Sequence, residues 1–326
     1  MRDGHRDAGQ APVVTAVRRG VLECIGGTRM VALHHAGPGR GARILLKLES
    51  ENPTGSMKDR MALSMIEAAE RDGRLPAGGP VVEYTTGSTG AALALVCRVK
   101  GHPLHLVTAD AYAQEKRDSI AIYGPQMHVL TGHGGMTEAL TLAMVGEARA
   151  IAARTGAYWT DQLRNTDQTL GYETLAAEIW EQTGGRVDAF VQSVGTAGSI
   201  RGTAAGLRRR NPAVTIVAVE PAESPVLSGG SKGSHGIDGT GAGFVVPLWQ
   251  PDIANRIERV STDEAKAMVL HLARTEGLFA GTSTGANVVA ATRVAAALGP
   301  EATVVTLMCD TGIKYLTMYG ARLRSA

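Results

Sequence analysis

The chain has 326 residues, of which 44% are hydrophobic and 20% charged, so we expect a folded protein of about two domains. Its 33 basic and 31 acidic residues give a formal net charge of only +2, which offers no reason to expect nucleic acid or a membrane as a partner. Three scattered cysteines are too few for a disulfide framework or a zinc site, so we expect no metal and a reducing, cytoplasmic location.

Short apolar runs predict strands at residues 43–49, 81–85, 104–108, 126–130, 189–194, 214–220 and 303–308. Segments with helical spacing separate them, at residues 61–69, 91–100, 114–123, 136–154, 172–183, 200–209, 262–276 and 286–298. This alternation predicts an α/β fold of mostly parallel, twisted sheets flanked by helices. Two glycine-rich segments, 131–135 and 228–243, are predicted as loops. The second is either functional or a flexible excursion of the surface.

The first segment that could carry chemistry is NPTGSMKDR, at residues 52–60, between a predicted strand and a predicted helix. Pro53 and Gly55 end the strand, so Lys58 falls in the first turn of the helix. The positive end of the helix dipole disfavours an ammonium there, which lowers the pKa of the lysine and favours a nucleophilic amine. A lysine that simply extends into solvent is the alternative.

The second segment is GTAGS, at residues 195–199, again between a strand and a helix. Small residues let backbone N–H groups approach a bound anion, and the helix N-terminus adds positive potential. The segment matches neither the dinucleotide-binding pattern nor the Walker A pattern. We therefore expect a phosphate-binding loop, with plain packing of a tight turn as the alternative.

Two further segments of small residues open predicted helices. TTGSTG, at residues 85–90, places hydroxyls and glycines where a carboxylate can bind, although ordinary capping would need only one of these hydroxyls. GTSTG, at residues 281–285, can also be a cap. In an α/β sheet such loops meet at the carboxyl ends of the strands, where ligands bind.

Taken together, these segments resemble the fold type II pyridoxal-phosphate enzymes, specifically the cysteine synthase (O-acetylserine sulfhydrylase) and cystathionine β-synthase group. The resemblance covers about residues 22–316, with the segments IGGTRMVAL, KLESENPTGSMKDR, TTGSTG, EIWEQTGGRVDAFVQSVGTAGSIRGT, GIDGTGAGF, AGTSTGAN and DTGIKYL. It implies a tryptophan synthase β-like fold in which residues 52–160 form a smaller mobile domain with the substrate-carboxylate loop. Residues 1–51 and 161–326 then form the larger domain, which binds pyridoxal 5'-phosphate.

The resemblance also implies roles for particular residues. Lys58 matches the lysine that forms the internal aldimine with pyridoxal phosphate, and Ser283 matches the hydroxyl residue at the pyridine nitrogen. The phosphate-binding loop corresponds to Gly195, Thr196, Ala197, Gly198 and Ser199, with Ala197 where a third glycine is common. The residues that bind the substrate α-carboxylate correspond to Thr85, Thr86, Thr89 and Gln162.

The implied reaction is β-replacement on an activated serine such as O-acetylserine, through an aminoacrylate intermediate, to give cysteine or a related β-substituted alanine. Lys58 acts as general base, and the neutral Ser283 hydroxyl favours loss of a β-leaving group over transamination. β-Elimination, as in a cysteine desulfhydrase or a serine/threonine dehydratase, shares these steps and stays open.

One position departs from the family pattern. Ser88 stands where asparagine usually contacts the cofactor 3′-oxygen and the substrate, so that contact is lost, made through water or supplied by another group. This departure favours the elimination alternative. The expected partners are an amino-acid substrate, a small nucleophile, a second copy in a homodimer and, as in bacterial cysteine synthases, a serine acetyltransferase tail in the cleft.

Overall fold

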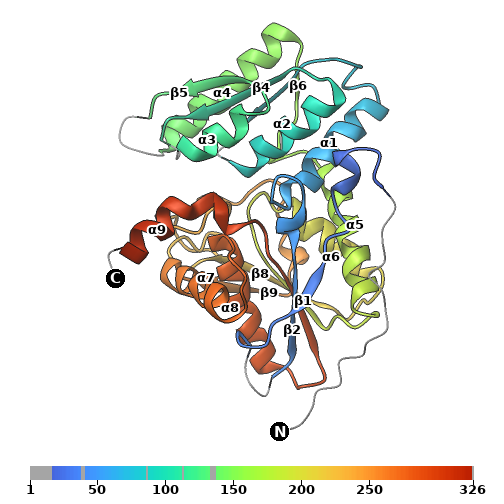
Figure 1. Ribbon diagram of the computed structural model, residues 1–326, viewed down its shortest axis with the longest axis vertical. Helices are drawn as coiled ribbons and strands as arrows, with labels where there is room; N and C mark the ends of the chain where they lie inside the picture. The colour runs from blue at the N-terminus through green and yellow to red at the C-terminus, as the bar shows by residue number, and fades with distance from the viewer. Residues whose placement is uncertain (1–16, 38–40, 86, 112–113, 133–136, 325–326) are drawn as a thin grey trace.

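Two sheets organise the computed structural model, which describes residues 17–37, 41–85, 87–111, 114–132 and 137–324 (Figure 1). The larger sheet has six strands in the spatial order β1-β2-β10-β7-β8-β9, and all its neighbours are parallel except β1 and β2. Its strands are β1 (Met30–Ala32), β2 (Arg43–Lys47), β7 (Ala189–Ser193), β8 (Thr215–Pro221), β9 (Arg256–Val260) and β10 (Thr303–Leu307).

The smaller sheet has four parallel strands in the order β5-β4-β3-β6. The chain builds it between β2 and β7, as an excursion from the larger sheet. Its strands are β3 (Val81–Tyr84), β4 (Leu104–Ala109), β5 (Gln126–Leu130) and β6 (Tyr158–Trp159).

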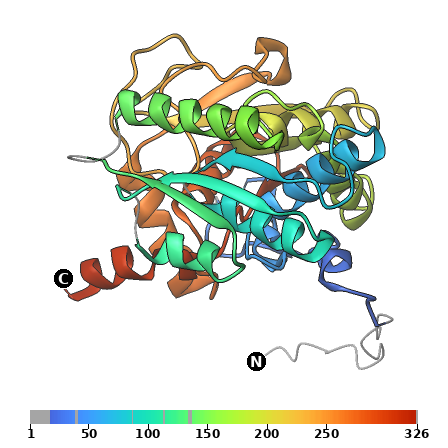
Figure 2. The ribbon, with the colours of Figure 1, turned by 90° about the horizontal axis from the view of Figure 1, so that it is seen from above.

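Helices cover both faces of each sheet. Helix α4 lies on one side of the smaller sheet, and α2 and α3 lie on the other (Figure 2). The larger sheet has α5 and α6 on one face and α7 and α8 on the other (Figure 1). The α-helices are α1 (Lys58–Arg71), α2 (Ser88–Lys100), α3 (Gln114–Ala121), α4 (Glu138–Thr155), α5 (Gln168–Gln182), α6 (Gly198–Arg208), α7 (Thr262–Thr275), α8 (Thr282–Ala297) and α9 (Leu316–Arg324). The short 3-10 helices are η1 (Val21–Cys24), η2 (Glu49–Glu51), η3 (Pro251–Ile253) and η4 (Gly312–Tyr315).

Strands of the larger sheet send side chains into two separate cores. Leu45 and Phe190 pack with the α5 and α6 side chains, whereas Ile44 and Val191 pack with α7 and α8. A strand buried on both faces needs apolar residues at successive positions, which is why these strands read as continuous apolar runs. The structure thus confirms the predicted α/β class.

All seven predicted strands are present, but β1, β6 and β9 were not predicted. β1 and β6 are short, and the RIERV sequence of the edge strand β9 is mostly charged.

The loop at 228–243 is confirmed, whereas residues 133–135 of the other predicted loop lie outside the described residues. The smaller sheet occupies residues 81–159. The mobility of a domain at 52–160, and its separation from residues 1–51 and 161–326, stay predictions.

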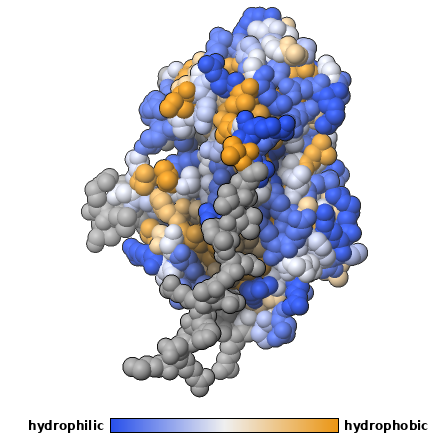
Figure 3. All heavy atoms as spheres, turned by 45° about the vertical axis from the view of Figure 1, so that its right-hand side comes forward, coloured by the Kyte–Doolittle hydropathy of each residue, from blue (hydrophilic) through white to orange (hydrophobic). Residues whose placement is uncertain are grey.

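The surface mixes apolar and polar side chains. On the face that Figure 3 shows, hydrophobic side chains lie in small groups among hydrophilic ones, an arrangement that is ordinary for a water-facing surface. None of the helices in the described part of the chain is long and apolar enough to cross a membrane.

Candidate active site

A cavity of about 650 Å³ lies between the larger sheet with its helices and the smaller sheet with its helices, which we call the larger and the smaller sheet unit. Its wall comes from the beginnings of α1, α2, α6 and α8, from α3 and η4, and from the glycine-rich loop around residues 235–242. Segments that are far apart in the sequence therefore meet around one space. The predicted site residues in its lining are Lys58, Thr85, Ser88, Thr89, Gln162, Gly195, Thr196, Ser199 and Ser283.

Among the described residues, two predicted ones are not part of this lining. Ala197 and Gly198 lie at the beginning of α6, directly between lining residues. Thr86 lies outside the described residues. The cavity thus brings the remaining predicted residues together, while their individual roles stay predictions.

Lys58 is the first residue of α1, as predicted, and its side chain reaches the cavity. Burial lowers the pKa of the Lys58 amine, although the nearby Cys309 and Asp310 oppose this shift. The direction agrees with our expectation, but its principal cause is burial rather than the helix dipole on which the expectation rested. Neutral amine is the form that can act as nucleophile or base.

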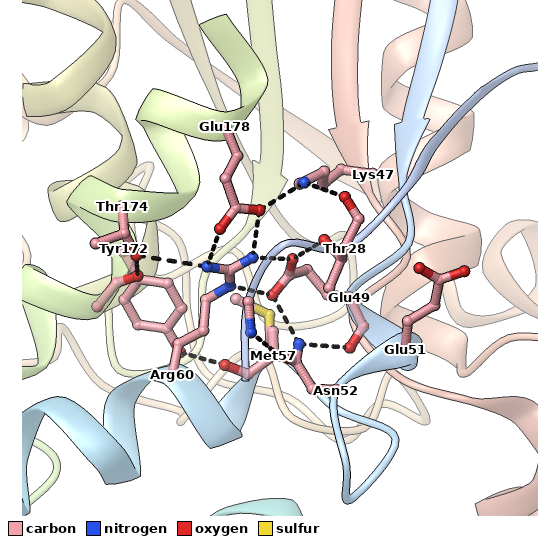
Figure 4. A network of polar contacts seen from close by, with 12 residues as sticks. Thr28, Lys47, Glu49, Glu51, Asn52, Met57, Arg60, Tyr172, Thr174 and Glu178 are labelled. Atoms are coloured by element: carbon pink, nitrogen blue, oxygen red, sulfur yellow. Dashed lines mark hydrogen bonds and ion pairs between the residues drawn. The ribbon is translucent and has the colours of Figure 1, made fainter. Parts of the chain in front are cut away.

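A buried polar network fixes the segment that carries Lys58 (Figure 4). Arg60 donates to Glu49 at 2.7 Å and to Glu178 at 2.8 Å, and Lys47 donates to Glu178 at 2.7 Å. The Tyr172 hydroxyl donates to the carbonyl oxygen of Met57, directly before Lys58, at 3.2 Å. The network therefore ties the beginning of α1 to α5 and to β2. Sequence reasoning missed it, because its members lie far apart in the chain.

The loop at 195–199 has the shape of an anion cradle. A Cβ atom on Gly195 would lie 2.4 Å from the carbonyl oxygen of Gly239, and one on Gly198 would lie 2.0 Å from Gln168 Oε1. Ala197 has φ of +68°, a left-handed conformation that explains why glycine is common at this position. The N-cap residue of α6 makes no side-chain hydrogen bond, and the Gly198 N–H makes only a long one, at 3.4 Å to Thr196 Oγ1, so the first turn of α6 can still bind an anion.

Gln192 is a cavity residue that the sequence did not reveal. Its Nε2 donates to the Ser199 hydroxyl, and its Oε1 is buried without a hydrogen-bond partner among the described residues. A buried acceptor of this kind is costly unless a ligand or water satisfies it. The signal in the sequence was weak, because Gln192 lies inside an apolar strand.

Among the described residues at the beginning of α2, no side-chain hydroxyl caps the helix. Thr89 Oγ1 instead donates to Gln162 Oε1 at 2.8 Å, and Gln162 Nε2 donates to the Tyr84 carbonyl at 3.0 Å. Behind them, Glu83 accepts from the Gln162 backbone N–H at 2.9 Å. This arrangement favours the predicted carboxylate seat over ordinary capping.

Glu83 is fully buried and was not predicted. Burial raises the pKa of Glu83 to about 7, against the opposing effect of four hydrogen-bond donors. The donors come from Tyr84, Trp159, Thr160 and Gln162.

Ser283 lies in the first turn of α8, a third helix that begins without a side-chain cap. The side chain is 6% exposed and lines the cavity. The part of the chain that the structure describes contains no cluster of three His, Cys, Asp or Glu residues arranged for a metal ion.

The donor set fits a phosphorylated pyridine aldehyde. The glycine cradle and the open α6 N-terminus suit a phosphate group, and the Lys58 amine suits the aldehyde. The Ser283 hydroxyl suits an uncharged ring nitrogen.

The sequence matches the family model of pyridoxal-phosphate dependent enzymes over residues 21–310. The chain therefore belongs to this family of enzymes, and its cofactor is pyridoxal 5'-phosphate. Within the family it is similar to cysteine synthase from Staphylococcus aureus (strain N315). The two are 37% identical over 299 residues, which cover 91% of this chain and 95% of that protein.

Solved structures agree with this relationship. O-Acetylserine sulfhydrylase isoform 3 from Entamoeba histolytica has a TM-score of 0.89 and 33% identity, with coverage of 94% of this chain and 92% of that chain. A hydrogen sulfide-producing enzyme from Fusobacterium nucleatum has a TM-score of 0.85 and 32% identity, with coverage of 92% and 100%. The expected fold type II class is confirmed.

Proposed function

We propose that this enzyme replaces the β-substituent of O-acetylserine, or a similar activated serine, with a small nucleophile to form cysteine or a related β-substituted alanine. One observation carries the proposal: Lys58 lines the same cavity as the uncapped beginnings of α2 and α6. An amine, a carboxylate seat and a phosphate seat thus surround one space. The similarity to cysteine synthase and O-acetylserine sulfhydrylase supports sulfide as the nucleophile.

Each part of the cavity has its own task in this reaction. Residues 195–199 would hold the phosphate of the cofactor, and the Lys58 amine would hold its aldehyde carbon. When bound, pyridoxal phosphate accepts the electron pair that deprotonation leaves at the substrate Cα. The Lys58 amine, whose pKa burial lowers, accepts the Cα proton. The substrate α-carboxylate is held by Thr85, Thr86, Thr89 and Gln162.

The test is an incubation of the purified holoenzyme with O-acetylserine and sulfide, followed by mass detection of amino-acid products. We expect cysteine and acetate in equal amounts. Lys58→Ala should abolish this turnover and change the cofactor absorbance. Steady release of pyruvate without a new amino acid would overturn β-replacement, and an unchanged cofactor absorbance in Lys58→Ala would overturn the role of Lys58.

β-Elimination is the second candidate. Two observations favour it: Ser88 at the asparagine position, and the similarity to a hydrogen sulfide-producing enzyme. Incubation with cysteine alone separates the two reactions, because elimination releases sulfide, ammonia and pyruvate. A rate of sulfide release above the rate of cysteine formation would favour elimination.

We further propose a homodimer in the cytoplasm, because the family resemblance suggests a dimer and all three cysteines are free thiols. Light scattering should give about twice the 34.0 kDa mass of one chain.

The family resemblance also suggests a serine acetyltransferase tail as a partner. A peptide of that tail should then compete with the amino-acid substrate for the cavity.

A further inference from the structure

Lys314 is a second lysine in the cavity, contributed by η4. Its Nζ donates to the Ser88 hydroxyl at 3.2 Å, so it reaches from the larger sheet unit to the first residue of α2. Its carbon chain passes close to Gly55, where an added Cβ would lie 3.9 Å from Lys314 Cε. Sequence reasoning assigned Lys314 no role.

The ammonium of Lys314 is left without an anion. Ser88 accepts one of its three N–H donors, and no carboxylate in the described part of the chain forms an ion pair with it. Burial lowers the pKa of Lys314, and the attraction of Asp310 and Asp59 opposes this shift. Lys58 and Lys116 repel it. A half-buried cation of this kind gains free energy when an anion binds beside it.

The two acidic groups near Lys314 form their hydrogen bonds with other residues, and Asp310 Oδ1 is buried without a hydrogen-bond partner among the described residues. The Asp310 carboxylate accepts from the Tyr315 hydroxyl at 2.8 Å, and Asp59 accepts from the Thr54 backbone N–H at 2.7 Å. Burial raises the pKa of both carboxyls, to about 6 for Asp59. Both attract the ammonium, but neither forms an ion pair with it in the described part of the chain, so an anion bound in the cavity would be its first close anionic partner.

Lys116 differs from Lys314 although both line the cavity. Its Nζ pairs with Asp238 at 3.2 Å and lies 4.9 Å from the centre of the Tyr315 ring. Its charge is therefore compensated within the protein. Lys314 is the lysine whose ammonium faces the beginning of α2 with hydrogen-bonding capacity to spare.

The position of Ser88 identifies the anion. Ser88 opens α2, whose uncapped N-terminus and neighbouring Thr85 and Thr89 hydroxyls form the carboxylate seat described above. We propose that Lys314 is a substrate-binding residue that donates to the α-carboxylate of the amino-acid substrate, while Ser88 holds the ammonium in place. Lys314 thus supplies the polar contact for which the Ser88 side chain is too short. This assignment rests on the proposed function only in that the ligand is an α-amino acid.

The experiment measures binding without turnover. L-Serine and L-serinamide, which lacks the carboxylate charge, are titrated into the holoenzyme while the cofactor absorbance is recorded. A charge-assisted hydrogen bond contributes about 1.5–3 kcal/mol, so Lys314→Met should weaken L-serine binding about 10- to 150-fold. L-Serinamide binding should change less than about twofold, because it has no carboxylate to lose a contact.

Three further variants serve as controls for this titration. Lys314→Arg should restore L-serine binding to within about fivefold, since arginine also donates to carboxylates. Lys100→Met, which changes the last residue of α2 and lies at the opposite end of that helix from Ser88, should bind both ligands like the wild type. If Lys314→Met does not retain the cofactor, Lys314→Gln is compared in its place.

Equal losses for L-serine and L-serinamide, or no loss for either, would overturn the assignment. Failure of the enzyme to convert O-acetylserine would overturn the proposed reaction instead, because these titrations need no product.

Discussion

Arg60 lies two residues after Lys58 on α1, and its guanidinium binds the Glu49 carboxylate through two hydrogen bonds, at 2.7 and 2.9 Å. The side chains are 2% and 0% exposed, so this ion pair belongs to the interior. It forms the centre of the network in Figure 4 and holds the beginning of α1 against η2, while Glu178 links the same guanidinium to α5. The helix that presents Lys58 is thereby fixed by charges that solvent cannot screen.

Replacing Arg60 with methionine should lower the free energy of unfolding by about 3–5 kcal/mol, because it leaves the Glu49 carboxylate buried without its cation. Urea unfolding measures the loss. The matched control is Arg29→Met, which removes an ion pair with Glu51 whose arginine side chain is 82% exposed. That change should cost less than about 1 kcal/mol. Similar losses in the two variants would contradict the importance of the buried pair.

The close packing of the loop at residues 195–199 leads to a second prediction, which concerns cofactor affinity. Gly195→Ala places a Cβ atom 2.4 Å from the Gly239 carbonyl oxygen, so the loop must shift away from its anion-binding shape. Overpacking of this kind costs about 1–3 kcal/mol, and we expect cofactor affinity to fall about 5- to 150-fold. Fluorescence titration of the apoenzyme with pyridoxal phosphate measures this change.

Gly146→Ala is the control for this substitution. Gly146 lies inside α4, and nothing lies within 4 Å of an added Cβ there. Alanine should stabilise the helix by up to about 1 kcal/mol and leave cofactor affinity unchanged. A Gly195→Ala variant that binds the cofactor like the Gly146→Ala variant would show that the close approach to Gly239 is unimportant.

The parts of the site that the sequence predicted are contiguous segments. Lys58 and the loops at 85–90, 195–199 and 281–285 each place glycines or hydroxyls directly before a helix, and that local pattern alone indicates an anion or an amine at a helix N-terminus. The parallel sheets were predictable for a similar reason, because strands buried on both faces are mostly apolar along their length.

The remaining features depend on contacts between distant residues. Arg60 meets Glu178 across 118 positions of sequence, and Lys314 meets Ser88 across 226. A charged residue in such a pair looks like an ordinary surface residue until the fold buries it. Glu83 is a further example, since its charge within the VVEYT strand gave no sign of the donors that surround it.

From the raised pKa of Glu83 we expect the free energy of unfolding to depend on pH. Burial raises its pKa in the folded protein to about 7, whereas the unfolded chain has the usual value of about 4.3. The folded protein therefore holds an extra proton between these values, and stability falls as pH rises through this window. The loss should total on the order of 3 kcal/mol and be complete somewhat above pH 7.

Glu83→Gln removes this titration, because glutamine stays neutral. The free energy of unfolding of the wild type, minus that of the variant, should decrease from pH 5 to about pH 7 and stay level above it. Urea unfolding at half-unit steps of pH measures the difference, and other titrating groups such as Asp59 cancel between the two proteins. A difference that does not change with pH would show that Glu83 ionises at its ordinary pKa.

The three thiols should react at very different rates with a thiol reagent such as 5,5'-dithiobis(2-nitrobenzoate). Cys24 is exposed, whereas burial raises the pKa of Cys97 to about 12 and that of Cys309 to about 11. Because the thiolate is the reactive form, the native protein should show one fast thiol, and the protein unfolded in urea should show three. Cys24→Ser should abolish the fast phase. A fast phase that remains in that variant would mean that the reagent reaches a buried thiol, with Cys309 the candidate because it lines the cavity.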